Sequence, residues 1–203
     1  MCVVLKGAGL LVHFMEDFLK FPKLSTNRLI LDELRLEDSE SLYRHFENKE
    51  VVKYYDLEAF TNIDQALSLI QLFIRRFNEN LGIRWAIKLK SNGEFVGTCG
   101  FNSWNPKMKS SVIGYDISRN YWRNGYATEA LREIIKFGFS GSLPCGTLNR
   151  IQGDTVPGNV ASEAVLKKLG FKEEGLLRES GYWKGHFHDL KCFSLIKSEY
   201  NEI

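Results

Sequence analysis

The sequence predicts a single domain of the α+β class, built on a largely antiparallel sheet. The 203 residues, 44% of them hydrophobic and 26% charged, fit one globular domain that buries its own core. Strand, helix and hairpin patterns follow one another irregularly along the chain, without the repeating strand–helix units of a parallel sheet. No internal repeat or low-complexity stretch is present. These observations together favour a mixed, mostly antiparallel sheet packed against helices.

One strand and two helices are expected in the first third of the chain. Arg28–Leu34 alternates partly and predicts a strand. A helix is expected to begin near Glu37, where acidic side chains suit the positive end of the helix dipole. A second helix should run from about Asp64 to Asn80, capped by Thr61 or Asn62. The apolar stripes expected to face the sheet are Leu42, Tyr43 and Phe46 in the first helix, and Leu67, Ile70, Phe73, Ile74 and Phe77 in the second.

Three antiparallel strands are predicted next. Arg84–Leu89 alternates, Ser91–Gly93 is a strong turn signal, and Glu94–Phe101 returns as the second strand of a hairpin. Asn102–Lys109 is polar and contains a proline, so we expect a loop there. The third strand is Val112–Ile117.

The rest of the chain predicts three more strands and a short helix. The strands are expected at Arg150–Thr155, Phe171–Arg178 and Phe187–Lys197. Between the first two of these, a Pro-Gly-Asn turn opens a helix over Val160–Leu169. Together with the three preceding strands, they supply most of one sheet.

The connection after Val112–Ile117 carries the clearest chemical signal. A polar, basic segment, Arg119–Gly125, leads directly into a helical pattern. The first turn of a helix has unpaired N–H groups and the positive end of the dipole, so it favours a phosphate. Gly125 lets the backbone approach such a ligand, and Arg119 and Arg123 add positive charge. On these features alone, an ordinary strand-to-helix connection is an equally good interpretation.

Residues Tyr121–Leu131, YWRNGYATEAL, resemble the acetyl-CoA-binding segment of the GNAT acetyltransferase superfamily. The wording is most similar to the branch that contains the ribosomal-protein-alanine N-acetyltransferases. Trp122 stands where the general motif has Arg or Gln. Three further stretches resemble that branch in the same order: Thr26–Leu31, Asn159–Phe171 and Gly185–Leu190.

This resemblance implies the GNAT fold, with a mixed, mostly antiparallel central sheet and helices on both faces. The domain is expected over residues 25–198, after an N-terminal extension, residues 1–24, and before a short tail, residues 199–203. Members of the branch usually begin as this chain does from Met15, so Met15 is the expected biological start. The mildly apolar beginning is interrupted by Gly7 and is not expected to act as a secretory leader.

The resemblance also implies a transfer of an acetyl group from acetyl-CoA to an amine, by direct attack within a ternary complex. The family's pantetheine arm pairs with the strand equivalent to Val112–Ile117, and its pyrophosphate lies on the turn Arg123–Ala127. In the family, the equivalent of Asn159 contacts the pantetheine arm, and the equivalent of Ser162, or a nearby Tyr, protonates the departing thiolate. The expected acetyl-CoA-binding residues are Ile117, Ser118, Trp122, Arg123, Asn124, Gly125, Tyr126, Ala127, Thr128, Asn159 and Ser162. Local pattern alone predicts only a helix cap at Asn159 and a first-turn serine at Ser162.

The catalytic base does not carry over directly from the family, because many relatives have Glu where this chain has Val112. Asp116 lies on the same face of the strand by alternation and is the candidate substitute. A solvent-facing strand residue is the alternative interpretation of Asp116. The expected catalytic residues are therefore Ser162, Asn159 and Asp116.

A protein N-terminal α-amine, as in the ribosomal-protein-alanine type, is the first choice of acceptor. A polyamine, amino acid or aminoglycoside is the second choice, and an acyl-CoA sensor without turnover is a different class. In the family, the region of the first two helices and the loop between them, here Val51–Phe60, form one wall of the acceptor site, which makes Tyr54, Tyr55 and Phe60 candidates alongside Tyr182 and Trp183. A nucleotide-binding module is disfavoured, because neither phosphate-binding glycine motif of that class is present.

Composition argues against several other classes. A net charge of +2 without long basic runs argues against a nucleic-acid-coating protein. No run of about twenty apolar residues predicts a membrane span. The four cysteines are far apart and two alternating histidines, His186 and His188, lack a third ligand nearby, so no metal site is expected. We expect a cytoplasmic protein that is a monomer or a homodimer.

Overall fold

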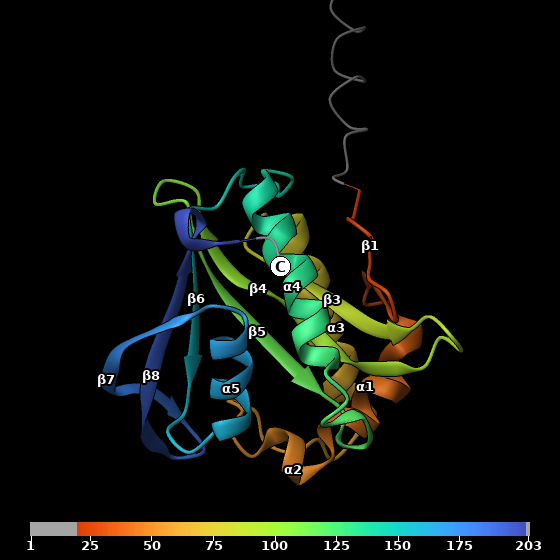
Figure 1. The fold of residues 1–203 in the computed structure, drawn as a ribbon. Coiled ribbons are helices and arrows are strands. Elements are labelled where there is room, and N and C mark those ends of the chain that lie inside the picture. Colours follow the sequence, from red (N-terminus) through yellow and green to blue (C-terminus); the bar gives the residue numbers. More distant parts are fainter. Residues whose placement is uncertain (1–19, 202–203) are drawn as a thin grey trace, which may run out of the picture.

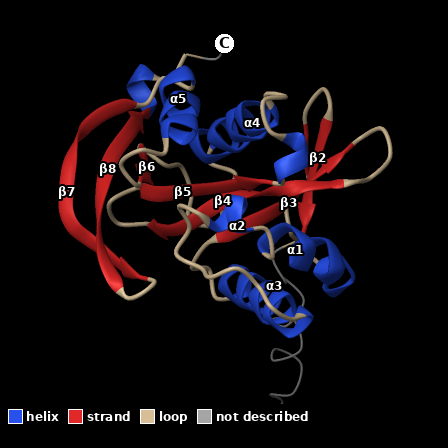
Figure 2. Cartoon of the chain, turned by 90° about the horizontal axis from the view of Figure 1, so that it is seen from below, coloured by secondary structure: helices blue, strands red, loops and turns tan. Residues whose placement is uncertain are grey.

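The computed structural model describes residues 20–201, which form one eight-stranded sheet with helices on both faces. Figure 2 shows α4 and α5 on one face of the sheet and α1, α2 and α3 on the other. The expected N-terminal extension falls largely on residues 1–19, outside the described residues, as does the expected start at Met15. Within the described part of the chain, no helix is both long and apolar enough to cross a membrane.

The strands are ordered β1-β2-β3-β4-β5-β6-β8-β7, and every neighbouring pair is antiparallel except β5 and β6. This confirms the α+β class and the largely antiparallel sheet. The strands are β1 (Leu24–Ser25), β2 (Leu29–Glu33), β3 (Ile83–Leu89), β4 (Phe95–Asn105), β5 (Ser110–Ile117), β6 (Arg150–Thr155), β7 (Lys172–Trp183) and β8 (His186–Ile196).

The helices are α1 (Ser39–Phe46), α2 (Lys49–Val52), α3 (Ile63–Asn78), α4 (Tyr126–Ser140) and α5 (Val160–Lys168). Three short 3₁₀ turns accompany them, at Leu36–Asp38, Arg119–Tyr121 and Lys197–Glu199. Asn62 is the cap of α3: its side chain accepts from the Gln65 backbone N–H, and the Gln65 side chain accepts in return from the Asn62 N–H.

Two hydrophobic clusters hold the layers together. The larger cluster packs α4 against the sheet around Trp85, Phe101 and Phe193, all of which are almost fully buried. The smaller cluster packs α1 and α3 against the other face and includes Leu42 and Phe46. The predicted helix stripes therefore face the sheet except at Leu67, which belongs to neither cluster, while the neighbouring Ala66 is buried.

Two sequence expectations for this region were wrong in detail. The segment Asn102–Lys109 was expected to be a loop, but β4 continues to Asn105 because a bulge between Phe101 and Ser103 lets the hairpin with β5 go on pairing. The wall segment Val51–Phe60 begins inside a helix, since α2 runs over Lys49–Val52 and is capped by Asn48.

Candidate active site

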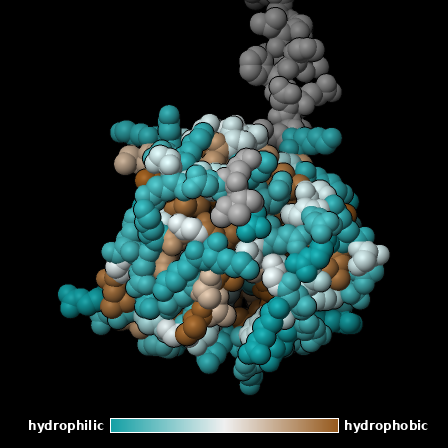
Figure 3. Space-filling view, viewed as in Figure 1, coloured by the Kyte–Doolittle hydropathy of each residue, from teal (hydrophilic) through white to brown (hydrophobic). Residues whose placement is uncertain are grey.

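The two central strands β5 and β6 run side by side for only a short distance. Their parallel register covers Ser110–Val112 against Arg150–Gln152, and beyond Val112 the two strands diverge (Figure 1). Helix α5 follows β6 and lies beside this opening. The space-filling view shows hydrophobic side chains around a hollow near the lower ends of α4 and α5 (Figure 3). The sheet therefore offers strand edges to a ligand at its centre.

The turn between β5 and α4 is shaped by backbone conformation. Gly125 precedes the first residue of α4 with φ at +79°, and Arg123 has φ at +64°. A Cβ on Gly125 would meet only the Arg28 guanidinium, at 3.6 Å, so glycine is required here by conformation while the space beside it is open. No side chain of the described residues caps this helix end. The first N–H groups of α4 therefore face an open surface, which suits an anion.

Side chains from the β1–β2 region hold this turn from outside. Arg28 donates from Nη2 to the Asn124 carbonyl at 3.0 Å and from Nε to Glu129 at 2.7 Å. Thr26 donates to the same carboxylate at 2.5 Å. Partial burial of Glu129 favours its neutral form, but these hydrogen bonds outweigh burial and lower the pKa of Glu129. The first turn of α4 is thereby fixed to the sheet edge.

Trp122 ties the turn to the end of β5. Its indole Nε1 donates to the Ile117 carbonyl at 2.6 Å, and the Arg119 guanidinium lies 4.5 Å from the centre of its ring. The residue that replaces the usual Arg or Gln thus contacts the protein's own backbone. Trp122 therefore helps to fix the backbone conformation of the turn.

Tyr115 and Ser162 meet beside the opening, one from β5 and one from the first turn of α5. Their hydroxyl oxygens are 2.6 Å apart, and the Tyr115 hydroxyl also donates to the Ser162 carbonyl at 3.1 Å. Burial raises the pKa of Tyr115 to about 12, although the hydrogen bond to Ser162 opposes this rise. Asn159 caps α5 by accepting from the Ser162 N–H at 3.3 Å. The structure therefore brings the two predicted residues of α5 together with a tyrosine.

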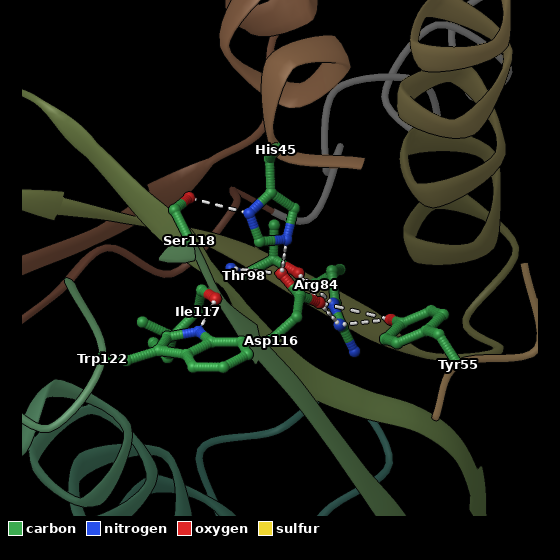
Figure 4. A network of polar contacts seen from close by, with 8 residues as sticks. All are labelled: His45, Tyr55, Arg84, Thr98, Asp116, Ile117, Ser118 and Trp122. Carbon is green, nitrogen blue, oxygen red and sulfur yellow. Dashed lines mark hydrogen bonds and ion pairs between the residues drawn. The ribbon is translucent and has the colours of Figure 1, made fainter. Parts of the chain in front are cut away.

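Asp116, the next residue of β5, lies on the opposite face in a buried network with His45, Tyr55, Arg84 and Thr98 (Figure 4). The Arg84 guanidinium makes a very short ion pair with Oδ2, which also accepts from the Thr98 hydroxyl at 2.7 Å and from the Tyr55 hydroxyl at 3.2 Å. Oδ1 accepts from the Thr98 N–H at 3.0 Å and lies 2.8 Å from His45 Nε2.

The surroundings of Asp116 stabilise its charged form. Burial by itself disfavours the carboxylate, but Arg84 and His45 outweigh burial and hold the pKa of Asp116 well below its usual range. Burial also raises the pKa of the neighbouring Tyr55 hydroxyl. A carboxylate with so low a pKa and so many donors is a weak proton acceptor. That Asp116 acts as the catalytic base stays a prediction, and these contacts argue against it.

The predicted acceptor wall divides into core and surface residues. Phe60 is buried against Phe46, with ring centres 5.2 Å apart. Tyr54 donates to the Gly158 carbonyl at 3.0 Å, beside the cap of α5. Trp183 stacks on His188 with ring centres 4.0 Å apart.

Lys184, at the tip of the β7–β8 hairpin, donates to the Val52 carbonyl of α2 at 2.7 Å. Together with the bond from Tyr54 to Gly158, this contact makes the segment after α2 bridge the two halves of the divided sheet. The segment therefore closes one end of the opening between β5 and β6.

Sequence reasoning missed His45, Arg84 and Tyr115. Arg84 is a charged residue inside an apolar alternating run, which was a usable signal of a buried ion pair. For metal binding, the described residues contain no group of three or more His, Cys, Asp or Glu side chains that could hold an ion.

Comparisons with known proteins agree with this architecture. Residues 28–172 match the family model described as an acetyltransferase (GNAT) domain. The chain is 39% identical over 177 residues to the uncharacterized N-acetyltransferase YoaA of Bacillus subtilis (strain 168), a match that covers 87% of this chain and 98% of that relative.

Two solved structures have the same fold at lower identity. One is the acetyl transferase of Salmonella typhimurium that modifies the N-terminal serine of ribosomal protein L7/L12, with a TM-score of 0.73, 20% identity and coverage of 84% of this chain and 96% of that chain. The other is the microcin C7 self-immunity acetyltransferase MccE in complex with acetyl-CoA and AMP, with a TM-score of 0.76, 22% identity and coverage of 84% and 93%. With its family model, its close relative and its fold in agreement, this chain belongs to the GNAT family of N-acetyltransferases.

Proposed function

We propose that this enzyme uses acetyl-CoA to acetylate a primary amine, and that the acceptor is a protein N-terminal α-amine. The observation that carries the proposal is the pair of hydroxyls of Tyr115 and Ser162, next to the point where β5 and β6 separate. A thioester bound along the edge of β5 would present its sulfur near these hydroxyls. The proposal therefore assigns to this pair the role of hydrogen-bonding the departing thiolate.

The remaining features of the opening suit acetyl-CoA as donor substrate. The open turn at Gly125 and the first N–H groups of α4 would hold the pyrophosphate. Thr155, at the end of β6, is buried, and its hydroxyl has no hydrogen-bond partner among the described residues, which suits a site meant for a polar ligand. Asn159 stands at the start of α5, where its remaining amide N–H groups could reach the pantetheine arm. The proposed donor-contacting residues remain those expected from the family motif.

In the proposed reaction, the neutral amine nitrogen attacks the acetyl carbonyl, the C–N bond forms and the C–S bond breaks. The nitrogen loses a proton, and the CoA thiolate finally gains one. A Tyr115 hydroxyl with a pKa of about 12 stays protonated at neutral pH. It would have to give its proton uphill by about 3.5 pK units, roughly 5 kcal/mol, to a thiolate whose thiol has a pKa near 8.5. We therefore assign Tyr115 and Ser162 to hydrogen bonding of the thiolate, with full proton transfer left to solvent.

The acceptor assignment follows from the two positions of β5 at which a carboxylate base was expected. Asp116 is committed to Arg84, and position 112 carries valine. An α-amine, with a pKa near 8, is short of neutrality at pH 7 by about one unit, or about 1.4 kcal/mol. A lysine amine near 10.4 is short by over three units, between about 4 and 5 kcal/mol. A site in which neither of these two positions supplies a free carboxylate is better suited to the α-amine, which a chain of water molecules can deprotonate.

Release of free CoA thiol from acetyl-CoA tests the proposal. The acceptors are short peptides with Ala, Ser or Met at the N-terminus, the same peptides with a blocked N-terminus, a lysine side-chain amine, and a polyamine. Thiol release that needs the free peptide N-terminus is the expected result. Release driven only by polyamine would overturn the peptide assignment while leaving the donor chemistry intact.

A further inference from the structure

The chain leaves the sheet at Ile117, the last residue of β5. Residues 118–125, which connect β5 to α4, are called the donor turn below, and Ser118 is the first of them. At this point a side chain from the opposite helical layer reaches the turn. Ser118 Oγ lies 2.7 Å from Nδ1 of His45, which is on α1 and has a fully buried side chain (Figure 4). The contact joins residues 73 positions apart in the sequence. None of the roles assigned above uses it.

His45 has a second polar neighbour on the other side of its ring. Nε2 lies 2.8 Å from the Asp116 carboxylate, although the ring is not aligned for a straight hydrogen bond. The two ring nitrogens therefore face two oxygens, one on Asp116 and one on Ser118. The remaining faces of the ring contact Phe46 and Phe95, which leave it little freedom to turn.

We propose that His45 is a positioning residue for the acetyl donor: through the chain Asp116–His45–Ser118 it fixes the start of the turn that binds the donor pyrophosphate. The inference rests on the proposed function, in which acetyl-CoA occupies this turn. His45 touches no substrate and acts only through Ser118.

The consequence is an effect on donor affinity. A turn held in its bound conformation loses less conformational freedom when a ligand binds, so more of the interaction energy appears as affinity. Other contacts also hold the turn, among them those from Trp122 to Ile117 and from Arg28 to Asn124, and the Ser118 backbone N–H donates to the Val96 carbonyl at 2.7 Å. The His45 contact adds a bond to the Ser118 side chain.

Calorimetric titration with CoA tests this inference in the whole chain. His45→Ala and Ser118→Ala should each weaken CoA binding by roughly three- to tenfold, the range expected for one net hydrogen bond. The double variant should bind no more weakly than either single variant, because both remove the same contact. With a peptide acceptor, KM for acetyl-CoA should rise while kcat changes less than twofold.

Conservative variants separate positioning from general packing. The amide of His45→Asn can take the place of Nδ1 and hydrogen-bond to Ser118, whereas the amide of His45→Gln reaches the position of Nε2 and leaves the Ser118 hydroxyl without this partner. His45→Asn and Ser118→Thr should bind CoA within about threefold of the wild type. His45→Gln should resemble His45→Ala.

Thr98→Val is the matched control. It removes the buried hydroxyl that donates to the same Asp116 carboxylate and accepts from Arg84 Nε, without touching Ser118. It should lower the melting temperature and leave CoA affinity within twofold. If Ser118→Ala and His45→Ala change the affinity no more than Thr98→Val does, the positioning role is overturned although the donor site stands. If the wild-type chain fails to bind CoA at all, the proposed function falls as well.

Discussion

Tyr115 and Asp116 are neighbours in β5, yet they lie on opposite faces of the sheet in opposite kinds of surroundings. Tyr115 meets a serine at the start of α5, beside the opening between β5 and β6. Asp116 meets an arginine, a histidine and two hydroxyls deep under α1 and α3. Asp116, which has the more acidic side chain of the two, therefore makes more hydrogen bonds and ion pairs than Tyr115. In this site, the face of the strand on which a side chain lies decides whether it can reach a bound substrate. The acidity of the side chain does not predict this.

The largest expected effect is on stability, from the Asp116 face. Arg84→Met leaves the Asp116 carboxylate buried without its strongest partner, so the free energy of unfolding should fall by about 3–5 kcal/mol. Urea unfolding of the variant measures this loss. Arg150→Met is the control, because its partner Glu174 is about half exposed, and such a pair contributes about 1 kcal/mol or less. Equal losses in the two variants would remove the distinction between the faces.

The next effect is on catalysis, from the Tyr115 face. Tyr115→Phe removes the hydroxyl that we assign to the thiolate, and kcat should fall about 100-fold. Steady-state kinetics with a peptide acceptor measure this change, and the melting temperature should fall only slightly. Tyr121→Phe, which removes a surface hydroxyl bonded to Glu94, serves as the control and should keep its kcat. An unchanged kcat in Tyr115→Phe would contradict the assignment.

Acid should reveal the same division through stability. The pKa of Asp116 is lower in the folded than in the unfolded chain, so its stabilising contribution is present above the unfolded value of about 3.9 and is lost as pH falls toward the folded value. The stability difference between the wild type and Asp116→Asn should be constant from pH 7 to about 5. Below about pH 4 it should shrink by about 1.4 kcal/mol per pH unit. Unfolding in urea at each pH measures both; a difference that shrinks near pH 6 would assign the linkage to another group.

The smallest effect is expected at the turn that both faces share. Trp122→Phe keeps an aromatic ring near Arg119 and loses the N–H bond to the Ile117 carbonyl, which is worth about 1 kcal/mol. CoA affinity should fall by roughly fivefold, with kcat unchanged. Trp104→Phe, which loses a similar bond to the Asn80 carbonyl far from the turn, should leave CoA affinity alone.

Local sequence signals predicted much of the fold. Alternation located β2, β3 and β5, and turn chemistry located the β3–β4 hairpin and the start of α4. The extension of β4 to Asn105 was missed, because a bulge restores pairing after a polar stretch. The short helix α2 was also missed, since four residues carry too little periodicity to be recognised.

The site was predicted less completely than the fold. Asn159 and Ser162 share one helical turn, so their proximity to each other follows from local spacing. The partners of Asp116 come from positions 32 and 71 residues away, and no local pattern says which strand or helix will cover a given face. Strand alternation placed Asp116 on the face of Val112, but it could not predict that Arg84 of β3 would form an ion pair with it on that face.

The brief pairing of β5 with β6 has a mechanical consequence. Three residue pairs join the two halves of the sheet at one end, and the bonds from Tyr54 and Lys184 join them at the other. Between these ends the Tyr115–Ser162 bond and the larger hydrophobic cluster connect the halves, but the two strands do not pair beyond Val112. A ligand that lies in the gap and bonds to both halves stabilises them against local opening. Bound donor should therefore slow amide exchange in β6 and α5 as well as in the turn that it contacts.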